Sequence, residues 1–300
     1  MAKICCWSLT GQRLRYCHCP CIPISPSRRW VPLLKPWKGL NMRAAEYDAM
    51  RAVEDRHWWY AVLRSLVQHA LAGRLSLRGR LLDAGCGTGG MLEFLREKMC
   101  DLDVAGVDAA EQAVRHCHQR GLITVQSGSV EALPYSDAAF DAVLSLDVLY
   151  HAGVNEEHAL AEMGRVLRPD GLLVLNLPAF AGLRGSHDVA VSGARRYTAC
   201  QVRTLLEDSS FVVEMIQYWN AWLFLPLLAW RRVSRMKAEQ GPAGESDLKI
   251  TPAWMNSVLT AIGRLDAGLC RELRLPFGSS VFAVARKMKH SPGGMQHGKN

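Results

Sequence analysis

The sequence predicts an α/β fold built on a doubly wound parallel sheet. One observation behind this prediction is the alternation of apolar strand patterns with helical patterns from residue 80 to residue 206, which is typical of repeated βαβ units with helices on both faces of a sheet. The other is a glycine-rich turn within Arg80–Gly90 (RLLDAGCGTGG), which joins an apolar strand to a helical pattern. A turn of this kind brings backbone N–H groups close to a ligand.

The predicted elements follow one another in the order that this fold requires. Apolar runs predict further strands at 103–108, 123–128, 140–147, 171–177, 211–217 and 280–286. Apolar residues at helical spacing predict helices at 111–119 and 155–167, and another that begins after Thr198, with Gln201 at the capping-box position.

Residues 42–73 predict two short helices around the aromatic cluster His57–Tyr60 (HWWY). Two adjacent tryptophans cannot point the same way on a helix, so we expect one to face the core and the other a cleft. Packing alone and a lid over a substrate both stay open for this cluster.

A helical insertion is predicted at about residues 219–278, before the last strand. Its first helix, Ala221–Trp230, is almost entirely apolar and is followed by arginines, but it is too short to span a bilayer. Its second helix begins at Pro252 and carries large apolar residues down one face: Trp254, Val258, Ile262, Leu265, Leu269 and Leu273. We favour packing of the first helix on that face; peripheral membrane contact through 219–235 is the alternative.

Charge and cysteines divide the chain into a short N-terminal part and a folded part. The net charge is +8, but residues 1–41 carry seven cations and no acid, which leaves +1 for the other 259 residues; a nucleic-acid surface is therefore not predicted. Five of the ten cysteines lie in the first 21 residues and the others are scattered, as in a reduced, cytoplasmic protein. We interpret 1–41 as a disordered tail or a mis-assigned start, 42–290 as one domain, and 291–300 as a frayed tail.

Two kinds of ligand fit the glycine turn. The spacing Gly85-x-Gly87-x-x-Gly90 with Asp108 downstream meets the dinucleotide fingerprint. The spacing Gly85-x-Gly87-x-Gly89 after Asp83 suits a ligand with an ammonium, a ribose and an adenine but no pyrophosphate. Asp83 favours the second ligand, because a carboxylate at this point repels a pyrophosphate and attracts an ammonium.

The successive motifs resemble those of class I S-adenosylmethionine-dependent methyltransferases, in particular the small-molecule group related to ubiquinone-biosynthesis methyltransferases. The motifs that carry this resemblance are DAGCGTGG at 83–90, GVD at 106–108, LPY at 133–135, FD at 140–141, LDVLYH at 146–151 and RVLRPDG at 165–171. The resemblance covers about residues 43–217. It implies a seven-stranded, mostly parallel sheet of Rossmann-like methyltransferase type with an antiparallel last strand.

The resemblance also implies which residues hold S-adenosylmethionine. The methionine end is assigned to Asp83, Gly85, Cys86, Gly87 and Gly89. The ribose is assigned to Asp108 and Ala109, the adenine to Ser129 and Val130, and the methyl side to Ser145 and Asp147. Members of the family usually have an acid where Ser129 stands, and a serine can still accept the adenine hydrogen bond.

Candidate catalytic residues are expected beyond the carboxyl ends of the strands. His151 follows the strand at 140–147, and its residue type suits proton transfer at neutral pH. His187 lies in the long loop 179–197, and Arg195 at the end of that loop has the chemistry to clamp a phosphate or carboxylate. A structural role is the alternative for each, and no metal site is predicted.

The resulting hypothesis is methyl transfer to a small-molecule or lipid-linked acceptor, at oxygen. The motifs EDRHWWY at 54–60 and RRYT at 195–198 also resemble a bacterial subgroup that accompanies cell-surface glycan and lipid-linked sugar enzymes. The alternatives are an NAD(P)-dependent oxidoreductase of Rossmann type and a non-catalytic cofactor-binding scaffold.

Overall fold

The structure is a computed structural model of the 300-residue chain. It describes residues 44–75, 79–185, 188, 192–237 and 252–288. The tails predicted at 1–41 and 291–300 lie outside these residues. Within the described ranges, no helix is both long enough and apolar enough to cross a membrane.

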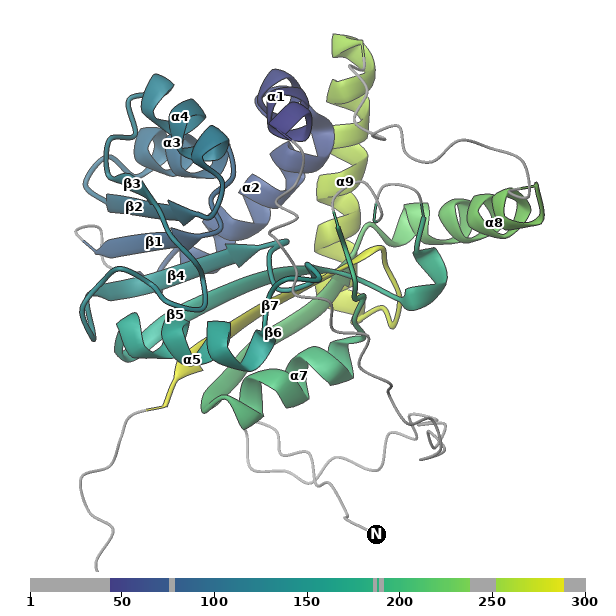
Figure 1. The fold of residues 1–300 in the computed structure, drawn as a ribbon. Helices are drawn as coiled ribbons and strands as arrows, with labels where there is room; N and C mark the ends of the chain where they lie inside the picture. The colour runs from purple at the N-terminus through teal and green to yellow at the C-terminus, as the bar shows by residue number, and fades with distance from the viewer. Residues whose placement is uncertain (1–43, 76–78, 186–187, 189–191, 238–251, 289–300) are drawn as a thin grey trace, which may run out of the picture. The chain divides into compact units, whose positions relative to one another are not determined.

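A seven-stranded sheet forms the centre of the described part of the chain (Figure 1). In chain order its strands are β1 (Arg80–Ala84), β2 (Asp103–Asp108), β3 (Val125–Ser127), β4 (Phe140–Leu146), β5 (Leu167–Pro178), β6 (Phe211–Trp219) and β7 (Ser280–Lys287). Their spatial order is β3-β2-β1-β4-β5-β7-β6. The strands from β3 to β5 pair in parallel, and β7 runs antiparallel between β5 and β6. The predicted fold class is therefore confirmed.

Helices cover both faces of this sheet (Figure 1). They are α1 (Ala44–Val53), α2 (Trp58–Leu71), α3 (Gly90–Lys98), α4 (Glu111–Gln119), α5 (Glu156–Val166), the 3-10 helix η1 (Ala181–Leu183), α7 (Ala199–Asp208), α8 (Ala221–Lys237) and α9 (Ala253–Leu273). One core includes Leu63, Leu92 and Cys117 of α2, α3 and α4. The other core includes Leu160 of α5 and Leu206 of α7, so the sheet has an apolar layer on each side.

Several element boundaries differ from the sequence prediction: β5 begins four residues earlier than predicted, and β6 ends two residues later. β3 is shorter than predicted, and Ile123 before it is 83% exposed. α8 continues through the arginines to Lys237 instead of ending at Trp230. Asn155 caps α5. The predicted capping box of Thr198 and Gln201 is present at the start of α7.

The chain order reverses between β1 and β4, which are neighbours at the middle of the sheet. Open α/β sheets bind ligands at the carboxyl ends of the strands beside such a reversal. Those ends carry three acids: Asp83 in β1, Asp108 in β2, and Asp147 directly after β4. The fold therefore brings the predicted cofactor residues to one edge of the sheet.

A buried ion cluster fastens the N-terminal helices to this edge. The Arg120 side chain, which follows α4 and is 2% exposed, donates to Glu54 at 2.6 Å and to Asp55 at 2.8 Å. Its Nε donates to the carbonyl of Thr88 in the glycine turn at 2.9 Å, and the Thr88 hydroxyl donates to Glu54. Arg120 also pairs with Glu93 of α3. One guanidinium thus joins the end of α1, the glycine turn and α3.

Helix α9 is held by a narrow, polar face. At Gly263, a Cβ would come within 2.7 Å of the Val62 side chain in α2, so glycine permits a close helix contact. Asn256 accepts the first backbone N–H of α2 at 3.1 Å. Asp266, 8% exposed, accepts the first two N–H groups of α8 at 3.1 and 3.0 Å. Side chains of α9 therefore cap two other helices.

The expected burial of the apolar face of α9 beneath α8 is wrong. Six large apolar side chains, here called the apolar stripe, are 37–71% exposed: Trp254, Val258, Ile262, Leu265, Leu269 and Leu273. α8 contacts α9 and η1, and its far end extends away from the sheet (Figure 1). The Asp266 caps fix where α8 begins, and this placement leaves the stripe uncovered.

Removal of the Arg120 side chain tests the ion cluster. Arg120→Met leaves the Glu54 carboxylate buried beside an apolar side chain, and loss of one member of a buried ion pair typically costs about 3–5 kcal/mol. We expect a decrease of that size in the free energy of unfolding, measured in urea. The matched control is Arg115→Met on the same helix, whose side chain is 61% exposed and should change stability by less than about 1 kcal/mol. Equal unfolding midpoints for Arg120→Met and the unmodified chain would contradict the assignment.

Candidate cofactor and acceptor site

The glycine turn has a backbone that ordinary side chains rarely adopt. Gly85, Gly87 and Gly89 have φ of 92°, 53° and 84°, in the left-handed region that glycine tolerates best. The N–H groups of Gly85 and Cys86 donate to the carbonyl of Val107 at 2.7 and 3.0 Å. The turn is therefore fixed to β2 before it enters α3.

Asp83 lies under this turn with part of its hydrogen-bonding capacity unused. The residue is 2% exposed, and its Oδ1 is buried with no hydrogen-bond partner. Burial raises the pKa of Asp83 to about 7, with further contributions from the charges of Asp108 and Glu54. An unpaired buried carboxylate oxygen is costly. An ammonium group satisfies it, so the site fits the amino group of S-adenosylmethionine.

Asp108 presents a second carboxylate at the end of β2. Its oxygens accept the backbone N–H groups of Gly87 and Ala110, each at 2.9 Å. Burial raises the pKa of Asp108, while these hydrogen bonds act in the opposite direction. A fixed carboxylate at the end of the second strand suits the two hydroxyls of a ribose.

Helix α1 closes over these two acids. The Tyr47 hydroxyl lies 3.4 Å from Asp108 Oδ1, and a Cβ at Gly87 would come within 2.7 Å of the Met50 side chain. Sequence reasoning missed this contribution. The available signal was weak: Tyr47 and Met50 are three residues apart on α1, and Glu54 follows the helix directly.

The residues predicted at the adenine end lie in a turn after β3. Ser129 is exposed and its hydroxyl accepts the N–H of Glu131 at 3.1 Å, while Val130 is buried. Ala109, after β2, is exposed. The Ser129 hydroxyl thus stabilises its own turn, and its predicted contact with adenine stays a prediction.

A chain of polar side chains crosses the sheet edge on the predicted methyl side. Asp147 has a left-handed φ of 55° and accepts the side-chain amide of Asn176 at 2.8 Å. Asn176 in turn accepts the indole N–H of Trp219 at 2.9 Å. Desolvation raises the pKa of Asp147 to about 7. The hydroxyl of Ser145 is buried here without a partner. The contacts of Asn176 with Asp147 and Trp219 were not predicted, since they join residues far apart in the sequence.

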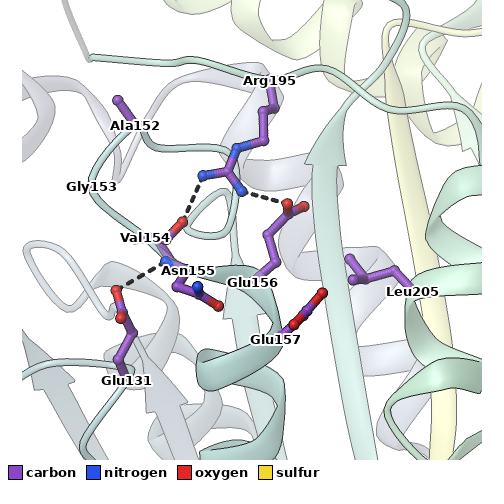
Figure 2. A pocket seen from close by; sticks show the side chains of 9 residues that line it. All are labelled: Glu131, Ala152, Gly153, Val154, Asn155, Glu156, Glu157, Arg195 and Leu205. Carbon is purple, nitrogen blue, oxygen red and sulfur yellow. Dashed lines mark hydrogen bonds and ion pairs between the residues drawn. The ribbon is translucent and has the colours of Figure 1, made fainter. Parts of the chain in front are cut away.

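The side chain of Arg195 contacts the backbone of His151. Figure 2 shows the contacts of Arg195 with Val154 and Glu156. The Arg195 guanidinium pairs with Glu156 at 2.5 Å and donates to the carbonyls of Val154 and His151 at 2.6 and 3.2 Å. The His151 ring packs against Tyr150, with centroids 4.3 Å apart. These contacts give both residues a structural role, and their catalytic roles stay predictions.

Arg195 borders a pocket of about 470 Å³. The lining residues are Glu131, Ala152, Gly153, Val154, Asn155, Glu156, Glu157, Arg195 and Leu205 (Figure 2). Three glutamates face one arginine, and Glu156 already pairs with that arginine. This charge balance argues against a phosphate clamp here.

The loop 179–197 contains one further predicted residue, His187, and next to it the buried acid Asp188. His187 lies outside the described residues. Its neighbour Asp188 is 3% exposed and forms a two-point ion pair with Arg196 at 2.9 and 3.1 Å. This pair joins Asp188 to the end of the loop at Arg196. Among the residues that the structure describes, no group of three His, Cys, Asp or Glu side chains is placed to hold a metal ion.

Comparison with known proteins identifies the central part of the chain. Residues 82–175 match a family model described as a methyltransferase domain. The match begins beside Asp83 and ends beside Asn176. It therefore contains the glycine turn, the end of β2 and the end of β4.

Three curated relatives agree with this match. A Mycolicibacterium smegmatis protein named "Probable S-adenosylmethionine-dependent methyltransferase" is 28% identical over 54% of this chain and 62% of its own length. The phthiotriol/phenolphthiotriol dimycocerosates methyltransferase 1 of Mycobacterium ulcerans is 33% identical over 41% of this chain and 44% of its own. The 27-O-demethylrifamycin SV methyltransferase of Amycolatopsis mediterranei is 35% identical over 38% and 46%. The chain thus matches about half the length of these relatives.

The fold has a counterpart among solved structures. A chain of the complex between the Haloferax volcanii Trm112 methyltransferase activator and a methyltransferase aligns with a TM-score of 0.51 and 19% identity, over 81% of this chain and 98% of that one. Residues 82–175 thus match a methyltransferase domain, and they lie within a fold that this solved chain shares.

The raised pKa of Asp83 predicts pH-dependent cofactor binding. Below a pKa of about 7 the carboxyl is mostly neutral and cannot pair with an ammonium charge. We expect the dissociation constant for S-adenosylhomocysteine, measured by calorimetry, to increase from pH 7.5 to pH 5.5 by up to about ten-fold per unit below the pKa. Asp83→Asn should bind weakly and lose this pH dependence.

Asp147→Asn is the matched control, because Asp147 also has a pKa of about 7 but lies on the methyl side. This variant should keep the pH dependence. If the pH dependence of the dissociation constant disappears in Asp147→Asn and persists in Asp83→Asn, the assignment of the ammonium to Asp83 is wrong.

Proposed function

We propose that the chain transfers a methyl group from S-adenosylmethionine to the oxygen of a small-molecule or lipid-linked acceptor. One observation carries the proposal. A buried carboxylate with an unpaired oxygen, Asp83, lies under a left-handed glycine turn, and a second fixed carboxylate, Asp108, ends the next strand. This pair matches the ammonium and the ribose of one ligand.

The bound cofactor supplies an activated methyl group, and the protein supplies position and electrostatics. In this proposal Asp83 holds the amino group, and the turn from Gly85 through Cys86 and Gly87 to Gly89 follows the methionine chain. Asp108 holds the ribose beside Ala109. Ser129 and Val130 border the adenine.

The acceptor is proposed to meet the methyl group beside Ser145 and Asp147. Asp147 is held by Asn176 at 2.8 Å and has a pKa of about 7, which suits a proton acceptor for a hydroxyl at neutral pH. His151, on the turn after β4, remains the second candidate for this role, and His187 and Arg195 remain candidates for contacting the acceptor.

The relatives support the class of acceptor. Two of them are named for acceptors with large apolar parts, a phthiotriol dimycocerosate and a rifamycin, and the second name specifies an oxygen. Membership of the group related to ubiquinone-biosynthesis methyltransferases is part of the same proposal.

The oxidoreductase alternative is disfavoured by charge. Pyrophosphate binding at the turn would bring two further negative charges towards Asp83 and Asp108, both of which are buried and weakly screened there. A scaffold without catalysis predicts cofactor binding but no methyl transfer, so the two experiments below separate it from the enzyme.

Calorimetry tests the cofactor half of the proposal. We expect S-adenosylmethionine and S-adenosylhomocysteine to bind, and NADH not to bind. Asp108→Ala should weaken binding on the order of 10²-fold, because hydrogen bonds to a charged group contribute about 1.5–3 kcal/mol each. Asp103→Ala at the other end of β2, where the side chain is 58% exposed, is the control and should bind normally. Tight NADH binding without S-adenosylhomocysteine binding would support the oxidoreductase instead.

Methyl transfer itself is tested with labelled cofactor. The protein is incubated with S-adenosylmethionine carrying a labelled methyl group and with a host-cell extract divided into lipid and water-soluble fractions. The proposal predicts label in one fraction and less label with Asp147→Asn. Alkaline hydrolysis then distinguishes the products: a methyl ester releases the label as methanol, and a methyl ether retains it. Cofactor binding with no label in either fraction would favour the scaffold.

A further inference from the structure

The apolar stripe of α9 is regular as well as exposed. Trp254, Val258 and Ile262 are followed eleven residues later by Leu265, Leu269 and Leu273. An eleven-residue repeat corresponds to about 3.67 residues per turn, close to the 3.6 of a straight helix. The six side chains therefore stay on one side of a helix of 21 residues, about 30 Å long.

The protein does not need this stripe to hold α9 in place. Gly263, Asp266, Ala267 and Cys270 are the buried residues of the helix, and they contact α2, α8 and the sheet side of the fold. The face of α9 that packs against the protein carries small and polar residues, and its most apolar face points outward. This is the reverse of an ordinary surface helix.

The exposed area is large for a monomer. An aromatic side chain presents roughly 150–250 Å² when free, and Val, Ile and Leu lie at or below the lower end of that range. These six are 37–71% exposed, so the stripe presents on the order of 600 Å². Soluble monomers rarely expose more than a few hundred Å² of contiguous apolar surface. A stripe of this size indicates a binding surface.

Charge around the stripe identifies its partner. Arg264, Arg271 and Arg274 are exposed on or directly after α9, against one exposed acid, Glu272. α8 adds the exposed Trp230 next to the exposed Arg232.

We propose that the α9 stripe, with the exposed apolar side chains of α8, docks on an anionic lipid surface. An apolar helical face flanked by arginines and tryptophans lies at the boundary of head groups and acyl chains, and its cations are attracted to anionic lipids. A second copy of the chain fits less well. Pairing of two copies through the stripe would bring the exposed Arg264, Arg271 and Arg274 of one copy towards those of the other, and like charges at an interface are unfavourable.

This docking deepens the proposed function and rests on it in one respect: it delivers the domain to a lipid-linked acceptor. The lipid contact itself is independent of methyl transfer. It is measured without cofactor or acceptor, so a failure of vesicle binding leaves the proposed reaction untouched, and a failure of methyl transfer leaves the lipid contact untouched.

The test is co-sedimentation of the full chain with phosphatidylcholine vesicles, with and without phosphatidylglycerol. We expect binding to the mixed vesicles, weaker binding to pure phosphatidylcholine, and loss of binding at high salt. The variant Trp254→Ser/Leu265→Ser/Leu269→Ser should partition at least ten-fold less. The control Ile123→Ser/Met288→Ser removes two apolar side chains that are 83% and 43% exposed elsewhere and should bind like the unmodified chain.

Two measurements keep the result interpretable. Thermal unfolding and S-adenosylhomocysteine binding should be unchanged in the stripe variant, since the substituted side chains are exposed, and Trp254→Ser alone serves if the triple variant does not fold. The proposal is overturned if the unmodified chain stays in the supernatant with both kinds of vesicle, or if the folded stripe variant sediments equally well. It is also overturned if ultracentrifugation finds a dimer that the stripe variant dissociates and no vesicle binding, because a second copy then covers the stripe.

Discussion

The burial of two carboxylates at the ends of adjacent strands is the constraint on which this site depends. Asp83 and Asp108 are 2% and 8% exposed, and buried charges are costly unless they are paired. Asp108 is stabilised by two backbone N–H groups, whereas Asp83 keeps an oxygen without a partner. The left-handed glycine turn directs the N–H of Gly87 to Asp108, and none of its N–H groups pairs with Oδ1 of Asp83.

The positions of α1, α2 and α9 follow from this arrangement. Arg120 ties the turn to the end of α1 through Glu54, so α1 lies across the turn and places Tyr47 beside Asp108. α2 begins a few residues later and is packed by α9 through Gly263. A continuous series of contacts therefore joins the glycine turn to α9. The apolar stripe of α9 points outward because the opposite face of the helix caps other helices and packs closely on α2.

Sequence reasoning found what is local and missed what joins distant residues. The glycine turn, the succession of strands and helices along the chain, and the capping box at Thr198 depend on neighbours in sequence, and they were predicted. The contacts of Tyr47 with Asp108, of Glu54 with Arg120 and of Asn176 with Trp219 join residues 61, 66 and 43 positions apart. No single sequence displays such pairs. The apolar pattern of α9 was visible, but the side that packs is decided by Gly263 and Asp266, which a hydrophobic pattern disregards. The roles of His151, His187 and Arg195 remain predictions.

The central claim is that the turn at Asp83 holds the amino end of the methyl donor. A crystal structure of the chain with S-adenosylhomocysteine tests it most directly. The account predicts the ligand amino nitrogen within hydrogen-bond distance of Asp83, directly or through one water, and both ribose hydroxyls on Asp108. A ligand bound with its amino group away from Asp83, or with the ribose away from Asp108, would contradict it.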